Sequence, residues 1–95
     1  MPAYLIADIE IHDPETYEEY KRIVPESVAQ HGGRFVIRGG AVESKEGGWN
    51  PKRLTVIEFP TLEQARRFYD SAEYAPALAL RLKSSNARLI LADGV

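Results

Sequence analysis

Cysteine is absent from this 95-residue chain, and histidine occurs only twice. Without cysteine, the protein has no disulfide, no thiolate zinc site and no cysteine nucleophile, and its composition fits a reducing compartment. Two histidines are also too few for a histidine-rich metal site. We therefore expect a protein that works without a metal and without a cofactor.

The chain also lacks long apolar runs and a strong excess of charge. No stretch approaches the roughly 20 apolar residues that span a bilayer, and no charged start precedes an apolar signal core, so we expect a cytoplasmic protein with no membrane partner. The net charge of −2 at pH 7 does not supply the positive field that phosphate-backbone binding requires. The tripeptide Arg38-Gly39-Gly40 occurs once, beside a strand pattern, and we expect no nucleic-acid partner.

The first helix is predicted to begin at Asp13-Pro14, an N-cap followed by a proline at the first helical position. Pro25 interrupts this helix, so we expect a kink or two short helices. Gly32 or Gly33 supplies the left-handed residue that ends it. The apolar stripe consists of four residues at spacings of three and four: Tyr17, Tyr20, Val24 and Val28.

A second helical region is predicted to begin at Thr61, which forms a capping box with Gln64. A further helical piece follows from about Glu73, with Leu78 and Leu82 facing inward. The apolar face of the earlier piece is formed by Leu62, Ala65, Phe68, Tyr69 and Ala72.

Alternation predicts strands over residues 3–11, 34–42, 53–59 and 87–93, the middle two joined as a long-looped hairpin. The order β-α-β-β-α-β predicts one ferredoxin-like α+β domain over residues 1–95, a four-stranded antiparallel sheet with helices on one face. The strands carry apolar residues on both faces, but helices can cover only one of them. We therefore expect a homodimer packed sheet to sheet.

Short motifs are spread across almost the whole chain. They are Asp13-Pro14 with Tyr17 and Tyr20, Val24-Pro25, His31-Gly32-Gly33-Arg34, Arg38-Gly39-Gly40, Glu46-Gly47 with Trp49, Arg53, Glu58-Phe59-Pro60, and Ser71 followed by Glu73-Tyr74. With these motifs the sequence resembles the small bacterial proteins grouped as domain of unknown function DUF1330, within the dimeric α/β-barrel superfamily. The resemblance implies a homodimer whose two sheets form a barrel.

The resemblance assigns no catalytic residue, because that family has no established activity. Relatives in the superfamily include cofactor-independent monooxygenases, muconolactone isomerases, haem-degrading enzymes and stress-induced barrels. These relatives share a fold, and a shared fold does not identify a function. Function must therefore be argued from individual residues of this chain.

His31 has three interpretations. It lies at the expected end of the first helix, where a histidine satisfies terminal carbonyls and favours the negative end of the helix dipole. It is also a candidate acid, base or ligand contact, because histidine titrates near neutral pH. Ligation of haem or a metal is the third interpretation.

Asp8, Arg38, Glu58 and Arg88 are single charges within otherwise apolar strands. Because unpaired buried charges are costly, some of them are expected to pair. One interpretation is a charge network that fixes strand register or the dimer. The other is a polar patch in a pocket, where Arg38 binds a carboxylate or enolate and two carboxylates transfer a proton.

The aromatic residues at helical spacing are interpreted as core, although buried tyrosine hydroxyls need partners, which favours a partly polar crevice between helices and sheet. Trp49, on the hairpin loop, is expected to pack across the dimer or over the mouth of a pocket. The residues expected to contact a ligand are Arg34, Arg38, Tyr20, Trp49, Tyr69 and Tyr74.

We expect the protein to bind a small aromatic or carboxylated molecule between its helices and its sheet. Two functions follow from this expectation. The first is a cofactor-independent monooxygenase or isomerase, in which His31, or the pair Asp8 and Glu58, moves a proton while Arg38 holds an anion. The second is a non-catalytic binding or stress-associated dimer, in which the same charges serve assembly.

Overall fold

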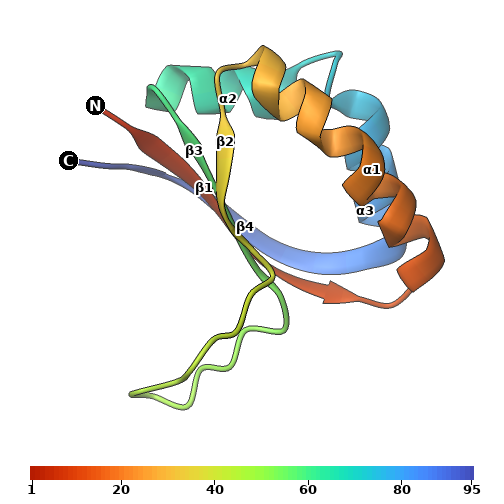
Figure 1. Cartoon of the computed structure of the whole chain (residues 1–95), viewed down its shortest axis with the longest axis vertical. Coiled ribbons are helices and arrows are strands. Elements are labelled where there is room, and N and C mark those ends of the chain that lie inside the picture. Colours follow the sequence, from red (N-terminus) through yellow and green to blue (C-terminus); the bar gives the residue numbers. More distant parts are fainter.

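The computed structural model describes all residues from 1 to 95 and contains one antiparallel sheet of four strands in the order β2-β3-β1-β4. The three helices lie on one face of this sheet (Figure 1), which confirms the ferredoxin-like fold. None of these helices has the length and apolar composition needed to cross a membrane. The elements are β1 (Ala3–Ile11), α1 (Pro14–Gln30), β2 (Arg34–Arg38), β3 (Leu54–Phe59), α2 (Leu62–Asp70), α3 (Ala75–Ser84) and β4 (Ser85–Asp93).

The two faces of the sheet differ in what covers them. On β1, Ala3, Leu5, Ala7 and Ile9 are buried beneath the helices, on what we call the helix face. The alternate residues of β1 point to the opposite side, the open face, which no helix covers. The same division holds for the neighbouring strands. Ala7 pairs with Thr55 of β3 and with Leu89 of β4, so these two residues also lie on the helix face.

A bulge in β2 changes which face its last residue occupies. The pairing of β2 with β3 shifts between Phe35 and Ile37, so that Val36 is the extra residue. Phe35 pairs with Ile57 before the bulge and Arg38 pairs with Thr55 after it, which places both Phe35 and Arg38 on the helix face. Uninterrupted alternation would have placed Arg38 on the open face.

The second strand is shorter than the sequence predicts, because it ends at Arg38 rather than at Val42. Gly39 follows with a φ of 74°, in the left-handed region that favours glycine, and turns the chain into the loop of residues 39–53. A Cβ on Gly39 would lie 2.3 Å from Nη1 of Arg53. The absence of a side chain at this position therefore allows Arg53 to pack directly against the backbone.

Helix α1 begins and ends as predicted. The side chain of Asp13 accepts hydrogen bonds from the Thr16 N–H at 3.3 Å and from the Thr16 hydroxyl at 2.7 Å. Gly32, with a φ of 75°, supplies the left-handed residue after the helix. However, α1 continues through Pro25 as one helix of 17 residues, so the expectation of two short helices was wrong.

Helices α2 and α3 differ in how well the sequence predicts them. Thr61 caps α2 as predicted, because its hydroxyl accepts the Gln64 N–H at 3.1 Å. In α3 the inward positions are Ala77, Arg81 and Ser84. Leu82 is 62% exposed, so the prediction that it faces inward was wrong, because the neighbouring Arg81 takes the buried position.

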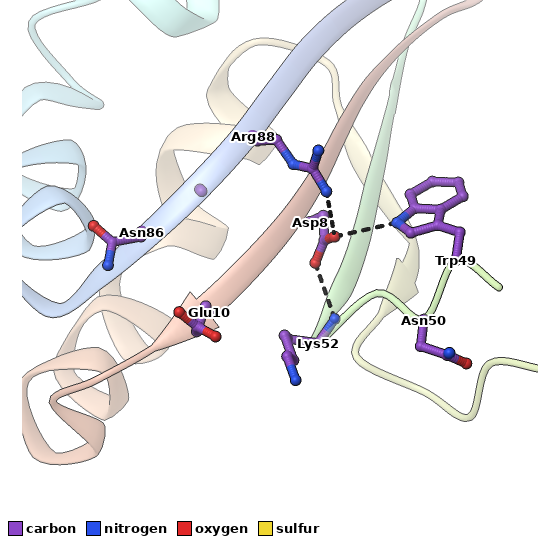
Figure 2. Close-up of a pocket in the computed structure, with 8 residues that line it drawn as sticks. Asp8, Glu10, Trp49, Asn50, Lys52, Asn86 and Arg88 are labelled. Carbon is purple, nitrogen blue, oxygen red and sulfur yellow. Dashed lines mark hydrogen bonds and ion pairs between the residues drawn. The ribbon is translucent and has the colours of Figure 1, made fainter.

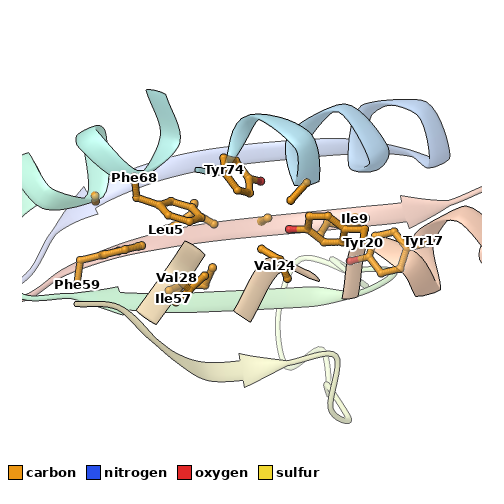
Figure 3. Close-up of a cluster of buried hydrophobic side chains, with 13 residues drawn as sticks. Leu5, Ile9, Tyr17, Tyr20, Val24, Val28, Ile57, Phe59, Phe68 and Tyr74 are labelled. Atoms are coloured by element: carbon orange, nitrogen blue, oxygen red, sulfur yellow. The ribbon is translucent and has the colours of Figure 1, made fainter. Parts of the chain in front are cut away.

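The hydrophobic core lies between the helix face and the three helices, and Figure 3 shows its main side chains. Phe68 of α2 lies between two other aromatic rings of this core, with its ring centroid 5.1 Å from that of Phe59 and 4.3 Å from that of Tyr74. Gly33 packs against the same group, since a Cβ there would lie 2.6 Å from the Phe59 ring. Aromatic contacts therefore hold α2 and the start of α3 against the sheet.

Candidate functional site

The helix face carries a polar cluster beside the apolar core, which we call the tyrosine–arginine cluster. Tyr17 and Tyr20 of α1 have ring centroids 5.2 Å apart, and Figure 3 shows them side by side at one end of the core. At this cluster the Nε–H of Arg81 donates a hydrogen bond of 3.3 Å to the Tyr74 hydroxyl. Its five members come from α1, α3 and the chain segments just before α3 and β3: Tyr17, Tyr20, Arg53, Tyr74 and Arg81.

Arg81 is a buried cation without a carboxylate partner. The residue is only 4% exposed, and none of the ion pairs of the chain includes it. Burial opposes its charge, but the interactions with Tyr74 and Tyr20 outweigh this effect, so the pKa of Arg81 is raised above its usual value. The guanidinium therefore stays charged, in a position where an anion would be favourable.

Tyr17 and Tyr20 are neutral hydrogen-bonding groups at physiological pH. Burial raises the pKa of Tyr20, and the nearby Tyr74 acts in the same direction. Burial also raises the pKa of Tyr17, although the charge of Arg53 opposes this effect. Their hydroxyls can donate hydrogen bonds to an anion, but they are poor bases.

A cleft of about 450 Å³ lies along the outer strand of the sheet on the helix side; we call it the β4 cleft. Its walls come from α2, α3 and β4, and Arg81 is its only charged residue. A shallow apolar cleft with one guanidinium suits an organic anion, because the apolar walls contact its body and arginine binds carboxylates in a bidentate manner. The lining residues are Tyr69, Arg81, Leu82, Ala87, Leu89 and Leu91.

Arg38 lies on the helix face but contacts neither Asp8 nor Glu58. Its Nη2 donates a hydrogen bond of 2.8 Å to the backbone carbonyl of Lys21 in α1. The guanidinium carbon lies 4.4 Å from the centre of the Phe35 ring. The bulge in β2 therefore separates Arg38 from the other three strand charges, of which Asp8 and Arg88 pair as expected for some of the four.

Asp8 lies on the open face, where it holds the loop of residues 39–53 against β1 (Figure 2). Its Oδ1 accepts a hydrogen bond of 3.0 Å from the Lys52 N–H, and its Oδ2 accepts one of 3.4 Å from the Trp49 Nε1–H. Arg88 Nη2 lies 3.6 Å from the same Oδ2. With these two hydrogen bonds and one ion pair, the Asp8 carboxylate anchors the loop to β1.

The Asp8 anchor borders two shallow hollows on the open face. One, of about 320 Å³, is polar and includes Glu10, Asn50 and Asn86. The other, of about 330 Å³, is mainly apolar and lies over the middle of the sheet. Trp49 borders both and is 57% exposed, so its indole lies at the rim of the hollows.

Glu58 forms a separate group at the other end of the open face. Its Oε1 accepts a hydrogen bond of 2.8 Å from Arg34 Nε, and its Oε2 accepts one of 3.2 Å from the Tyr4 hydroxyl. The bond to Glu58 raises the pKa of Tyr4. Glu58 pairs with Tyr4, four residues before Asp8 on β1, so the two carboxylates are about 13 Å apart along the strand and cannot share a proton.

His31 caps the end of α1. Its Nδ1 lies 2.9 Å from the Ser27 carbonyl, and its Nε2 lies 3.4 Å from Oε1 of Glu73. Its ring meets the edge of Phe68 at a centroid distance of 5.8 Å. These contacts use both ring nitrogens, and no group of three or more His, Asp or Glu side chains gathers to hold a metal ion.

Arg81 and Arg53 are not among the residues expected from the sequence to contact a ligand. The signal for Arg81 is a charge at an inward helical position, seven residues after the buried Tyr74 and four after the buried Ala77. Of the expected ligand residues, Tyr69 lines the β4 cleft, while Tyr20 and Tyr74 lie in the adjoining cluster. Arg34 and Trp49 lie on the open face.

Comparison with known proteins identifies a family and a fold. A protein-family model described as "Domain of unknown function (DUF1330)" matches residues 2–95. No curated protein matches the chain. Among solved structures, a protein of unknown function from Rhodopseudomonas palustris aligns with a TM-score of 0.74 and 16% identity, over 99% of this chain and 82% of that one.

Two further structures have the same fold. SnoaB from Streptomyces nogalater, described as a cofactor-independent oxygenase, aligns with a TM-score of 0.68 and 13% identity, over 99% of this chain and 93% of that one. A dimeric ferredoxin-like protein of unknown function from Thermobifida fusca aligns with a TM-score of 0.59 and 16% identity, over 99% of this chain and 92% of that one. At these identities the likeness establishes the fold alone.

Proposed function

The chain belongs to the DUF1330 family, and because the description of that family assigns no reaction, we propose a function from the geometry of the β4 cleft. We propose that the protein binds a small organic anion with an aromatic or aliphatic body. The body lies against the apolar walls of the cleft, and Arg81 pairs with the anionic group. The observation that supports this proposal is a buried, charged arginine that has no acidic partner in the chain.

The chemistry of Arg81 favours a carboxylate or another planar, delocalised anion. A guanidinium presents five N–H donors in a fixed fork, and the hydrogen bond to Tyr74 uses only one of them. The low polarity of the surrounding side chains strengthens the attraction to an anion. A neutral molecule of the same shape would leave the guanidinium unpaired and is expected to bind more weakly.

The proposal is tested by titrating the protein with benzoate and with benzamide, its neutral counterpart of the same shape. Backbone amide resonances in the ¹H–¹⁵N NMR spectrum are expected to shift around Leu89 and Leu91 with benzoate, and at least about tenfold more weakly with benzamide. Arg81→Gln is expected to remove this preference, whereas Arg66→Gln, an exposed arginine of α2, keeps it. Equal affinity for the two compounds in the wild type contradicts the proposal.

We also propose that the protein is a homodimer in which two open faces pack together to form a barrel. Apolar residues of the open face, including Ile6, Val56 and Ile90, have no cover within the chain. The charged residues that flank them are balanced, with Asp8 near Arg88 and Glu58 bound to Arg34, so two copies related by a two-fold axis are electrostatically compatible. The neighbour from Thermobifida fusca, described as dimeric, supports a dimer.

The reaction that we propose for testing is a cofactor-independent oxygenation or isomerisation of the bound anion. The fold likeness to SnoaB supports the oxygenase, and Arg81 would stabilise a phenolate or enolate in the cleft. Binding has the stronger support, because His31, Asp8 and Glu58 are each held by other contacts. Oxygen uptake in the presence of a polyphenol, if it is lost in Arg81→Gln, would indicate an oxygenase. Benzoate binding without any oxygen uptake would indicate a binding protein.

A further inference from the structure

Two buried polar atoms at the start of β3 have no hydrogen-bond partner. They are Nε of Arg53 and Oγ1 of Thr55, and no other buried side-chain nitrogen or oxygen in the chain is unpartnered. The two residues are separated by one position, so their side chains project from the same face, which is the helix face. Thr55 is only 7% exposed. Because buried polar groups are nearly always hydrogen-bonded, two such atoms on one face indicate a partner from outside the chain.

The surroundings of these two atoms are positively charged. Neither Arg53 nor Arg38 takes part in an ion pair, and Arg38 is the register partner of Thr55 across the β2–β3 pairing. Arg38 uses Nη2 to bind the Lys21 carbonyl, which leaves its other donors free. The guanidinium carbon of Arg53 lies 5.5 Å from the centre of the Tyr17 ring. The partner of Nε and Oγ1 is therefore expected to be an acceptor with negative charge.

We propose that Arg53, Thr55 and Arg38 form a second anion-binding site that takes one oxyanion group, a carboxylate or a phosphate. The Nε–H of Arg53 and the hydroxyl of Thr55 donate to its oxygens, and Arg38 contributes charge from the neighbouring strand. Gly39 makes room for this arrangement, because a side chain there would displace the Arg53 guanidinium. The site lies at the β2–β3 side of the sheet, separated from the β4 cleft by strand β1.

Thr55→Val tests the site with little risk to folding, because it replaces an unpartnered hydroxyl with a methyl group of similar size. In the absence of added anion its melting temperature is expected to equal or exceed that of the wild type. The probes are sodium acetate and inorganic phosphate at constant ionic strength, with chloride as the reference. The readouts are the Arg53 Nε–H resonance and the melting temperature.

In the wild type, acetate or phosphate is expected to shift the Arg53 Nε–H resonance and to raise the melting temperature above that in chloride. Thr55→Val and Arg53→Gln are expected to weaken this binding by about tenfold, the loss of one charge-assisted hydrogen bond. Arg66→Gln keeps the wild-type affinity. A response to acetate alone identifies a carboxylate, and a response to phosphate alone identifies a phosphate group.

Three results would overturn the second anion site. The Arg53 resonance fails to respond to either anion, or Thr55→Val binds the anion as tightly as the wild type. Alternatively, Thr55→Val lowers the melting temperature in chloride, which would mean that the hydroxyl is satisfied within the folded chain. None of these results affects the benzoate titration, which reports on Leu89 and Leu91 in the β4 cleft.

Discussion

Pro25 in α1 and Arg38 in β2 are linked through the backbone carbonyl of Lys21. A proline has no backbone N–H, so the carbonyl of Lys21, four residues earlier in α1, has no helical donor. Arg38 supplies that donor from β2, at 2.8 Å. The contact explains how α1 continues through a proline, and it shows that the arginine expected to hold a ligand has a structural contact with a helix.

Arg38→Ala is expected to lower the free energy of unfolding by about 1 kcal/mol, because the Lys21 carbonyl then depends on water. In a Pro25→Ala background the same change is expected to cost less, since the new backbone N–H bonds to that carbonyl. Urea unfolding of the four proteins gives the coupling energy, expected at about 0.5–1 kcal/mol. The stacking of Arg38 on Phe35 is present in both backgrounds and cancels. A coupling energy of zero would show that the carbonyl does not depend on Arg38.

Tyr20 is expected to lower the free energy of unfolding at alkaline pH. Burial raises its pKa in the folded protein above the ordinary value of 10.0, so the unfolded chain loses its proton first as the pH rises. The folded state then binds more protons than the unfolded state, and the free energy of unfolding falls as pH increases above about 10. Tyr20→Phe is expected to flatten this fall, as measured by urea unfolding from pH 8 to 11. An unchanged slope would indicate that Tyr20 ionises freely in the folded protein.

At the scale of elements, α1 depends on the carboxylate that caps it. The hydrogen bonds from the Thr16 hydroxyl and then from the Thr16 N–H lower the pKa of Asp13 below its ordinary value of 3.8. The ionised Asp13 contributes fully to the free energy of unfolding at pH values above 3.8. This contribution is lost as the pH falls through the lower pKa of the folded state, because the unfolded chain then binds more protons than the folded protein. Asp13→Asn keeps an N-cap acceptor without the charge, and its stability is expected to fall less between pH 4 and pH 2. If the free energy of unfolding falls equally in the wild type and in Asp13→Asn, Asp13 is not a source of the acid dependence.

Local patterns in the sequence predict the elements well but place some side chains on the wrong face. The caps at Asp13 and Thr61 and the left-handed Gly32 are confirmed, because each depends on a few neighbouring residues. The bulge in β2 is invisible in the sequence, since Phe35, Val36 and Ile37 are all apolar and a shift of one residue leaves the pattern unchanged. Simple alternation would therefore place Ile37 and Arg38 on the wrong face.

The candidate site was less predictable than the fold, because it depends on contacts between side chains rather than on local patterns. In α3 an apolar stripe favours Leu82 as the inward residue, but Arg81 is buried instead because Tyr74 accepts its hydrogen bond. That contact joins residues two helical turns apart, but the spacing alone does not indicate that an arginine rather than a leucine takes the buried position. The anchor between Asp8 and Trp49 joins residues 41 positions apart. The anchor has no periodicity that a single sequence could reveal.

At the scale of the whole molecule, a single chain has a small core and one unprotected face. Only 19 of its 95 residues are buried, as expected for a domain of this size, which gains little from its own core. The open face meanwhile presents Ile90 at 59% exposure beside the apolar hollow over the sheet. Packing two open faces together would bury these residues without disturbing either anion site, because both sites lie on the helix face.

The wild-type protein is therefore expected to have twice the chain mass of 10.7 kDa in native mass spectrometry and in light scattering after size exclusion. Val56→Asp and Ile90→Asp, which place an acid in the centre of the open face, are expected to give the mass of one chain at micromolar concentration. Leu82→Asp is the matched control, because it makes the same kind of change at an exposed apolar residue on the helix side, and it should stay dimeric. A wild type of 10.7 kDa, or a dimer that only Leu82→Asp dissociates, would place the contact elsewhere and leave the open face without its proposed role.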